Sequence, residues 1–127
     1  MNYGFSKLVS LSFSDAEQKV RDALQKEGFG VLTEIDVQAT LKKKLNADFR
    51  PYKILGACNP PFAYKALQAE DQIGLMLPCN VVLQEKLGKI EVSAIDPVAS
   101  MMAVKNSALE DVANEVRDKL KRMIDSL

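Results

Sequence analysis

The stretch IGLMLPCNVVLQEKLGKIEVSAI, residues 73–95, contains apolar runs separated by the pair Leu87 and Gly88. Apolar runs of this length, bounded by a glycine-containing pair, are typical of strands joined by a turn. Pro78 interrupts the first run, and a proline cannot donate a hydrogen bond within a central strand, so it marks an edge, a bulge or a strand start. The stretch therefore predicts strand structure that is broken at Pro78 and turns at Leu87 and Gly88.

The N-terminal segment predicts a strand followed by a helix. Residues 3–11 alternate between apolar and polar side chains, as a strand with one buried face does. Ser14 stands three residues before Glu17, which is the spacing of a capping box at the start of a helix. Gly28 supplies the left-handed residue that ends such a helix, with Phe29 folded back onto its last turn. The apolar stripe of this predicted helix consists of Val20, Ala23 and Leu24.

Two more strands are predicted between this helix and residue 73. Residues 30–36 form one, and the largely apolar residues 52–58 form the other, which we expect to be buried on both faces. Between them, Val37, Leu41 and Leu45 recur at intervals of four residues. This spacing predicts a short helix whose two leucines point inward.

The remaining helices are indicated by their first residues. Pro60 and Pro61 can open a short helix, because residues of the first turn need no N–H partner. Ser107 and Glu110 have the spacing of a second capping box, which opens the last helix. The last helix carries the longest apolar stripe of the chain, formed by Leu109, Val112, Ala113, Val116, Leu120, Met123 and Leu127.

The order of these elements predicts the fold class. A chain of 127 residues fits one domain, so residues 1–127 are expected to form a single unit. The predicted strands cluster late and the longer helices flank them, which favours α+β over a regularly alternating α/β fold. We therefore expect a mainly antiparallel sheet packed by two longer helices and several short ones.

The composition excludes several classes of function. Lys and Arg together number 17, as do Asp and Glu, and this balance argues against a nucleic-acid partner. The chain has no histidine, which removes a Ser-His-Asp or Cys-His arrangement, and its two cysteines cannot complete a four-ligand zinc site. No apolar stretch approaches the roughly 20 residues of a membrane span. With no signal peptide in the N-terminal residues, the expectation is a cytoplasmic protein with reduced thiols and no membrane partner.

The two cysteines are the main candidates for a functional site. Cys58 and Asn59 precede a proline, and Cys79 and Asn80 follow Pro78, so both pairs lie where extended chain meets a turn. A thiol in this position lies at the end of a strand, where it can bind a ligand or a soft metal, or carry sulfur or electrons in a redox reaction. The alternative is that each cysteine is a small buried hydrophobic residue.

Other candidates are weaker and have structural alternatives. Tyr52 and Asp96 are further candidates for binding a ligand, together with the two Cys-Asn pairs. Lys42, Lys43 and Arg50 form the only basic concentration and can hold an anion, or the lysines can be the solvated face of a short helix. A metal site built from acidic residues, Glu34, Asp36 and Asp96, is the less favoured explanation because carboxylates near turns are usually caps, so no metal is expected.

Four segments together resemble a known family. They are YKILGACNPPFAYKAL (residues 52–67), IGLMLPCNVV (73–82), IEVSAIDP (90–97) and the upstream EIDVQATLKKKLNADFRP (34–51). The ordered set Cys-Asn-Pro, Leu-Pro-Cys-Asn and Asp-Pro is similar to domain-of-unknown-function family 302, over nearly the whole chain. The resemblance implies an α+β fold like that of the TATA-binding protein. It implies neither DNA binding nor a settled activity, because a fold does not carry a function.

The direction of the strands decides whether the two cysteines meet. If the strand that ends at Cys58 and the strand at Cys79 are parallel neighbours, both thiols lie at one sheet edge and form two halves of one site. If the strands are antiparallel, as the family resemblance favours, we expect the thiols at opposite edges.

Three hypotheses for the function follow. The first is a small-ligand-binding module whose pocket is rimmed by the two Cys-Asn turns. The second is a thiol-dependent sulfur or redox carrier, or a soft-metal binder, that uses Cys58 or Cys79. The third is a structural homodimer without chemistry, since zero net charge and strand edges both favour self-association. The sequence indicates no particular cofactor, and it does not decide whether the protein is an enzyme.

Overall fold

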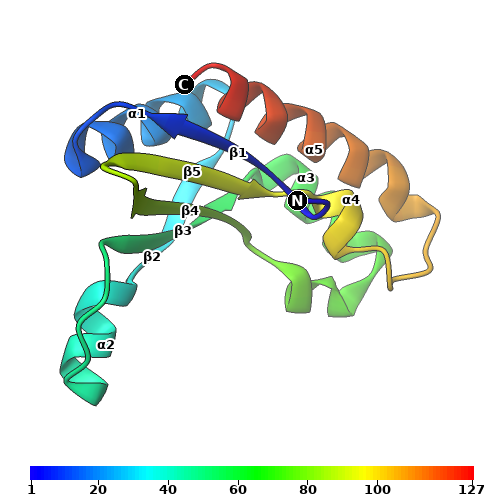
Figure 1. The fold of residues 1–127 in the computed structure, drawn as a ribbon. Coiled ribbons are helices and arrows are strands. Elements are labelled where there is room, and N and C mark those ends of the chain that lie inside the picture. Colours follow the sequence, from blue (N-terminus) through cyan, green and yellow to red (C-terminus); the bar gives the residue numbers. More distant parts are fainter.

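The computed structural model describes all 127 residues and confirms a single α+β architecture (Figure 1). One five-stranded sheet is packed by helices. The elements in chain order are β1 Gly4–Val9, α1 Phe13–Lys26, β2 Gly30–Asp36, α2 Val37–Leu45, β3 Tyr52–Cys58, α3 Pro60–Ala69, the 3₁₀ helix η1 Asp71–Met76, β4 Cys79–Lys86, β5 Lys89–Ile95, α4 Pro97–Ser100 and α5 Ala108–Asp125.

The sheet is antiparallel throughout, with the strand order β1-β5-β4-β3-β2. The predicted turn at Leu87 and Gly88 is confirmed, and it joins the neighbouring strands β4 and β5. Both turn residues have positive φ angles, 54° and 73°. Two consecutive positive φ values are the geometry of a type I′ turn, whose twist matches that of the strands it connects.

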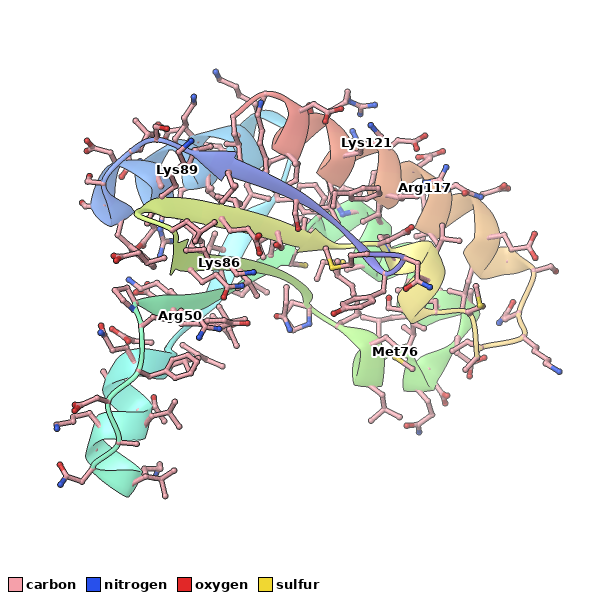
Figure 2. The ribbon with its side chains drawn as sticks, in the orientation of Figure 1. Arg50, Met76, Lys86, Lys89, Arg117 and Lys121 are labelled. Atoms are coloured by element: carbon pink, nitrogen blue, oxygen red, sulfur yellow. The ribbon has the colours of Figure 1, made fainter.

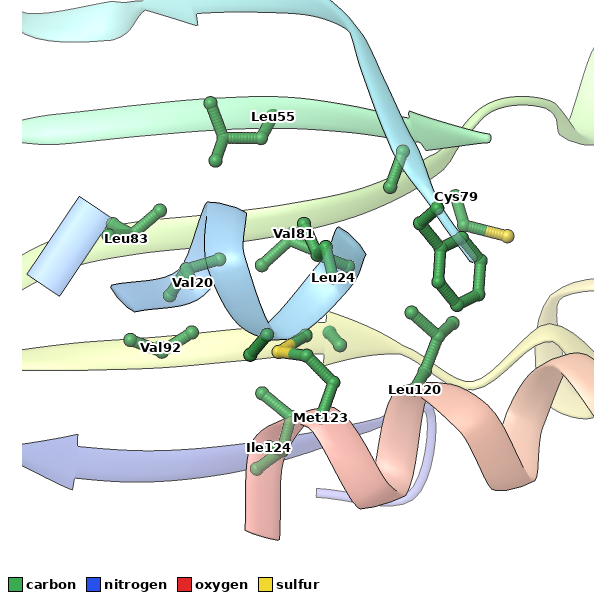
Figure 3. Close-up of a cluster of buried hydrophobic side chains, with 14 of the residues drawn as sticks. Val20, Leu24, Leu55, Cys79, Val81, Leu83, Val92, Leu120, Met123 and Ile124 are labelled. Carbon is green, nitrogen blue, oxygen red and sulfur yellow. The ribbon is translucent and has the colours of Figure 1, made fainter. Parts of the chain in front are cut away.

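The core lies between one face of the sheet and the helices α1 and α5 (Figures 1 and 3). Each central strand alternates between buried and more exposed side chains, so the strands contribute every second residue to this core. The predicted stripe of α1 and most of the predicted stripe of α5 are buried here. The fully buried members are Val20, Leu24, Leu55, Val81, Leu83, Val92 and Leu120.

The ends of α1 confirm one prediction and correct another. Gly28 has a φ angle of +85°, and its N–H donates to Gln25 while the N–H of Phe29 donates to Leu24, both at 3.0 Å. These are the two hydrogen bonds of a Schellman motif, as predicted. At the other end the cap is Ser12, whose Oγ accepts from the N–H of Asp15, and not Ser14. The helix begins two residues earlier than the capping-box spacing indicated.

The predicted capping box of α5 is also wrong in detail. Ser107 has helical backbone angles and makes no side-chain cap hydrogen bond. Instead, Asn106 Oδ1 accepts from the N–H of Ala108 at 3.0 Å, while its amide nitrogen donates to the carbonyl of Ala69 at 2.8 Å. Asn106 therefore fixes the start of α5 and ties it to the end of α3, two tasks that a serine side chain is too short to combine.

Two segments differ from the predicted arrangement. Residues 73–77 are not a strand, because most of them belong to η1, in which Ile73 is buried and Leu75 is 82% exposed. Their apolar side chains do not share one face, so the strand prediction fails and β4 starts only at Cys79. The short helix α2 is confirmed, but it has no buried residue and Leu45 is 71% exposed, so the prediction that Leu45 points inward is wrong.

The second face of the sheet carries no long helix. Figure 1 shows α1 and α5 on one side of the sheet, whereas α2 projects from the end of β2 on the other side. Half-buried and exposed side chains line this open face, among them Leu8, Ile35, Ile54 and Val82. No helix of the structure is long and apolar enough to cross a membrane.

Candidate functional site

A cavity of about 260 Å³ lies at the edge of the sheet where β3 ends and β4 begins. The helices α3 and α5 supply its other walls, and Figure 1 shows these helices converging at this end of the molecule. Fourteen of its 17 lining residues are hydrophobic, and none is charged. This is the site at which the sequence candidates Cys58, Asn59 and Cys79 come together.

The two cysteines reach this cavity by an arrangement that the sequence analysis did not anticipate. The strands β3 and β4 are antiparallel neighbours, and Ala57 pairs directly with Cys79. The parallel layout is therefore wrong, and so is the expectation that antiparallel strands separate the thiols. Cys58 is the last residue of β3 and Cys79 is the first of β4, and an antiparallel pair places the end of one strand beside the start of the next.

A β-bulge completes the rim of the cavity. The register between β2 and β3 shifts between Val31 and Thr33, which leaves Leu32 without a direct partner. A bulge of this kind redirects a side chain, and the exposed Leu32 lines the cavity next to the half-buried Cys58. Gly56 provides the room that this arrangement needs, since a Cβ atom there would lie 2.7 Å from Cγ of Pro78.

Asn59 has a structural task at the cavity wall. It is the one buried residue with a polar side chain, and its Nδ2 donates to the carbonyl of Glu27 at 3.1 Å. This hydrogen bond joins the end of α1 to the start of α3, which positions both α3 and the Schellman turn at Gly28. The amide nitrogen of Asn59 is therefore already engaged by the protein.

Cys79 is a buried thiol with 7% exposure, and no disulfide joins it to Cys58. Figure 3 shows it at the end of the core cluster, with its sulfur directed away from Val81 and Leu83. Burial raises the pKa of Cys79 from its ordinary value of 9.0 to about 11, and the nearby Cys58 adds to the rise. Since the thiolate is the nucleophile and the metal ligand, Cys79 is poorly suited to either role at neutral pH.

Three other ligand-binding candidates lie outside the cavity. Asn80 is exposed because it follows Cys79 in a strand that alternates between faces, so it lies on the open face of the sheet. Tyr52 is at the opposite end of β3 from Cys58, where its ring lies 6.0 Å from that of Phe49. Asp96 caps α4 by accepting from the N–H of Val98 at 2.9 Å. Asn80 is thus separated from Cys79 by the alternation of strand faces, and Tyr52 is separated from Cys58 by the length of β3.

The basic candidates lie near α2 and have separate partners. Lys42 forms an ion pair with Asp48 at 3.0 Å, and Lys43 is exposed on the same helix. Arg50 donates to Gln84 at 3.0 Å, and its guanidinium lies 4.4 Å from the centre of the Phe49 ring. The geometry therefore places all three at the opposite end of the sheet from the cavity.

The acidic residues considered as metal ligands are not grouped together. Lys53 lies 2.8 Å from both Glu17 and Glu34, and Arg21 lies 2.7 Å from Glu34, so Glu34 belongs to an ion-pair cluster that joins α1 to β2 and β3. The hydrogen bond from Lys53 lowers the pKa of Glu34. Asp36 accepts from the N–H of Ala39 and caps α2. Both Asp36 and Asp96 are helix caps, as the turn-based alternative predicted.

Most of the cavity wall was missed in the sequence because it is made of ordinary apolar residues. The side chains of Val112, Ala113 and Val116 come from the predicted stripe of α5, which the pattern indicated only as core. The residues Phe62, Ala63 and Ala66 come from α3, and Phe29 comes from the turn after α1.

Comparisons with known proteins agree with this fold. No curated protein is significantly similar to the chain. The crystal structure of an uncharacterized conserved protein DUF302 from Bacillus stearothermophilus superposes with a TM-score of 0.91 at 27% sequence identity, over 98% of each chain. The model of the family described as domain of unknown function DUF302 matches residues 5–127. The chain thus belongs to the DUF302 family, as the Cys-Asn-Pro, Leu-Pro-Cys-Asn and Asp-Pro segments indicated.

Proposed function

We propose that this protein binds an uncharged, largely apolar small molecule in the cavity between α3, α5 and the ends of β3 and β4. The observation that carries the proposal is the absence of any charged side chain among the 17 lining residues. The polar atoms available are the two thiols and the amide of Asn59, whose nitrogen already donates to Glu27. A charged ligand would lose its hydration there without gaining a partner.

The volume sets the size of the ligand. Engineered apolar cavities of roughly 150 Å³ bind benzene, and pockets for drug-sized ligands begin at about 300 Å³. A cavity of about 260 Å³ is between these two cases, so it suits a molecule somewhat larger than benzene. The half-buried Cys58 and the exposed Leu32 and Leu67 stand at its opening.

The thiol-dependent alternative has less support. Cys79 holds its proton at neutral pH, and no group of three or more Cys, Asp or Glu side chains is positioned to hold a metal ion. In the proposed function both sulfurs act as polarizable wall atoms, which favour contact with apolar and aromatic groups.

We expect toluene to shift the NMR signals of methyl groups that line the cavity, such as those of Ala66 and Val112, and the Ala63→Trp variant to lose this response. Ala63 is half-buried in the wall, so an indole ring at this position fills the space that toluene would occupy. The Ala39→Trp variant is the matched control, because Ala39 is exposed on α2 and far from the cavity. Shifts spread over the whole surface, or equal in both variants, contradict the proposal.

We also propose that two copies associate through the open face of the sheet. Five strands about 4.8 Å apart and about seven residues long present roughly 24 by 23 Å, and a standard interface needs about 800 Å² from each partner. The sheet alone is too small, so the projecting α2, which has no buried residue, is expected to contribute. A two-fold axis through the open face brings the lysines of α2 from each copy toward Glu70 and Asp71 of the other.

The charges and the shape of this face support that arrangement. Lys42 of α2 pairs with Asp48, but Lys43 and Lys44 on the same helix have no ion-pair partner in the chain, whereas Glu70 and Asp71 precede and begin η1. Figure 2 places Arg50, next to α2, and Met76, in η1, toward opposite ends of this side of the sheet. Opposite charges at the two ends are self-complementary under a two-fold rotation.

Sedimentation equilibrium at high micromolar concentration is expected to give a mass of twice 14.0 kDa. The Val82→Lys variant, which places a charge at the centre of the open face, is expected to be a monomer. Gln25→Lys adds the same charge on the exposed surface of α1 and serves as the control. A wild-type protein that remains monomeric at this concentration excludes the dimer.

A further inference from the structure

A second cavity of about 290 Å³ adjoins the first one. It is lined by nine residues from α4, from the connection that follows α4 and from the first turns of α5. Met101 and Ala113 line both cavities, so they belong to the wall that separates them.

The two wall residues differ in what they can do. Ala113 is part of α5 and is held by the helix, with only a methyl group to move. Met101 is 9% exposed in the connection between α4 and α5, and its unbranched side chain has three rotatable bonds. The side chain of Met101 can therefore change rotamer within the shared wall, whereas Ala113 cannot. Each cavity alone is just below the usual range for ligand pockets, and the two joined are well inside it.

Six of the nine residues that line the second cavity are hydrophobic, but unlike the first cavity it also has a charged residue in its lining. The first has no charged lining residue, whereas the second is lined by Glu110, Asn106 and Asn114. The side chain of Asn106 is engaged with the ends of α3 and α5. Asn114 donates its amide nitrogen to the carbonyl of Glu110 at 2.9 Å, which leaves its amide oxygen as an acceptor. Glu110 and Asn114 are both exposed, so this opening offers acceptors and one negative charge to solvent.

We propose that the two cavities form one site for a single-chain amphiphile with a small cationic or hydrogen-bond-donating head group, such as an alkylamine, and that Met101 is the gate between them. The inference rests on the proposed function, because the alkyl chain occupies the uncharged cavity. The chain passes Met101 and Ala113, and the head group lies against the carboxylate of Glu110 and the amide oxygen of Asn114. The acceptors and the negative charge match an amine, and they disfavour a carboxylate or phosphate head group.

The gate is tested with two probes, decylamine and toluene, whose binding is measured by calorimetry and by NMR. Toluene fits the first cavity alone, so its binding reports the proposed function. Val104→Trp changes a residue that lines only the second cavity, so it is expected to leave toluene binding intact and to weaken decylamine by about tenfold or more, which corresponds to roughly two methylene groups excluded from the second cavity. Met101→Ala is expected to bind decylamine more tightly than the wild type does.

The head group is tested at Glu110. Glu110→Gln is expected to weaken decylamine by about two- to fivefold, the effect of one exposed ion pair, and to leave decanol unchanged. The loss is expected to shrink at high salt. Glu115→Gln, on the exposed side of the same helix and outside both cavities, is the control.

The outcomes separate the two claims. If toluene fails to bind the wild type, the proposed function fails. If toluene binds, but decylamine binds equally to the wild type and to Val104→Trp, then the cavities are not joined and only this inference is overturned. Equal effects of Glu110→Gln on decylamine and on decanol overturn the assignment of the head group.

Discussion

Replacing Leu120 with alanine is expected to lower the free energy of unfolding by about 2–5 kcal/mol. Leu120 is fully buried in the middle of α5, in the same cluster as Leu24 and Val92. It therefore joins three elements: the last helix, the first helix and the sheet (Figure 3). The alanine leaves a cavity that these elements can close only by moving together, so the cost is expected to fall toward the upper part of this range.

Urea denaturation of the wild type, Leu120→Ala and Leu75→Ala measures this effect. Leu75 is 82% exposed in η1, so its replacement removes the same atoms without opening a cavity and is expected to change stability by less than about 0.5 kcal/mol. An unchanged denaturant midpoint for Leu120→Ala would show that the stripe of α5 is not part of the core.

The second large effect is a loss of stability at alkaline pH that depends on Cys79. Its pKa is about 11 in the folded protein and close to its ordinary value of 9.0 in the unfolded chain. Between these values the unfolded chain releases the thiol proton and the folded protein keeps it, so the unfolded state is favoured as the pH rises. The stabilisation is complete below pH 9 and is lost toward pH 11, and it amounts to about 2–3 kcal/mol.

Lysines and tyrosines also titrate in this range, so the measurement needs matched variants. Urea denaturation between pH 7.5 and pH 10.5, with a reductant present, gives the slope of stability against pH. Cys79→Ala is expected to have a shallower slope than the wild type, whereas Cys58→Ala keeps most of the wild-type slope because it retains the buried thiol. Equal slopes for the wild type and Cys79→Ala would mean that Cys79 titrates normally in the folded protein.

The sequence by itself determined the elements whose causes are local. The turn at Leu87 and Gly88 was predicted because short polar or glycine-containing breaks between apolar runs favour reversal of the chain. The Schellman end of α1 was predicted because Gly28 adopts positive φ without strain. The stripe of α5 was predicted because burial of one helix face repeats every three to four residues. The family resemblance added the arrangement of these elements into an antiparallel sheet.

One error in secondary structure concerns a segment whose periodicity is ambiguous. Residues 73–77 are nearly all apolar, and a short apolar run has no period that separates a strand from a helical turn. Packing decided the outcome, because only Ile73 of this run is fully buried in the small cluster formed with α3 and α5. Similarly, Leu45 follows the helical spacing of α2, but that helix projects away from the body of the protein, so nothing covers it.

The candidate site was decided only by the tertiary structure. The sequence singled out Cys58, Asn59 and Cys79, but their meeting depends on antiparallel pairing between the last residue of β3 and the first of β4. The cavity itself is space left among Phe29, Val112 and the residues of α3, which come from segments distant in the sequence. A periodic pattern fixes which side chains face inward. Whether those side chains fill the interior depends on the distances between elements, and these are set by the packing of the whole chain.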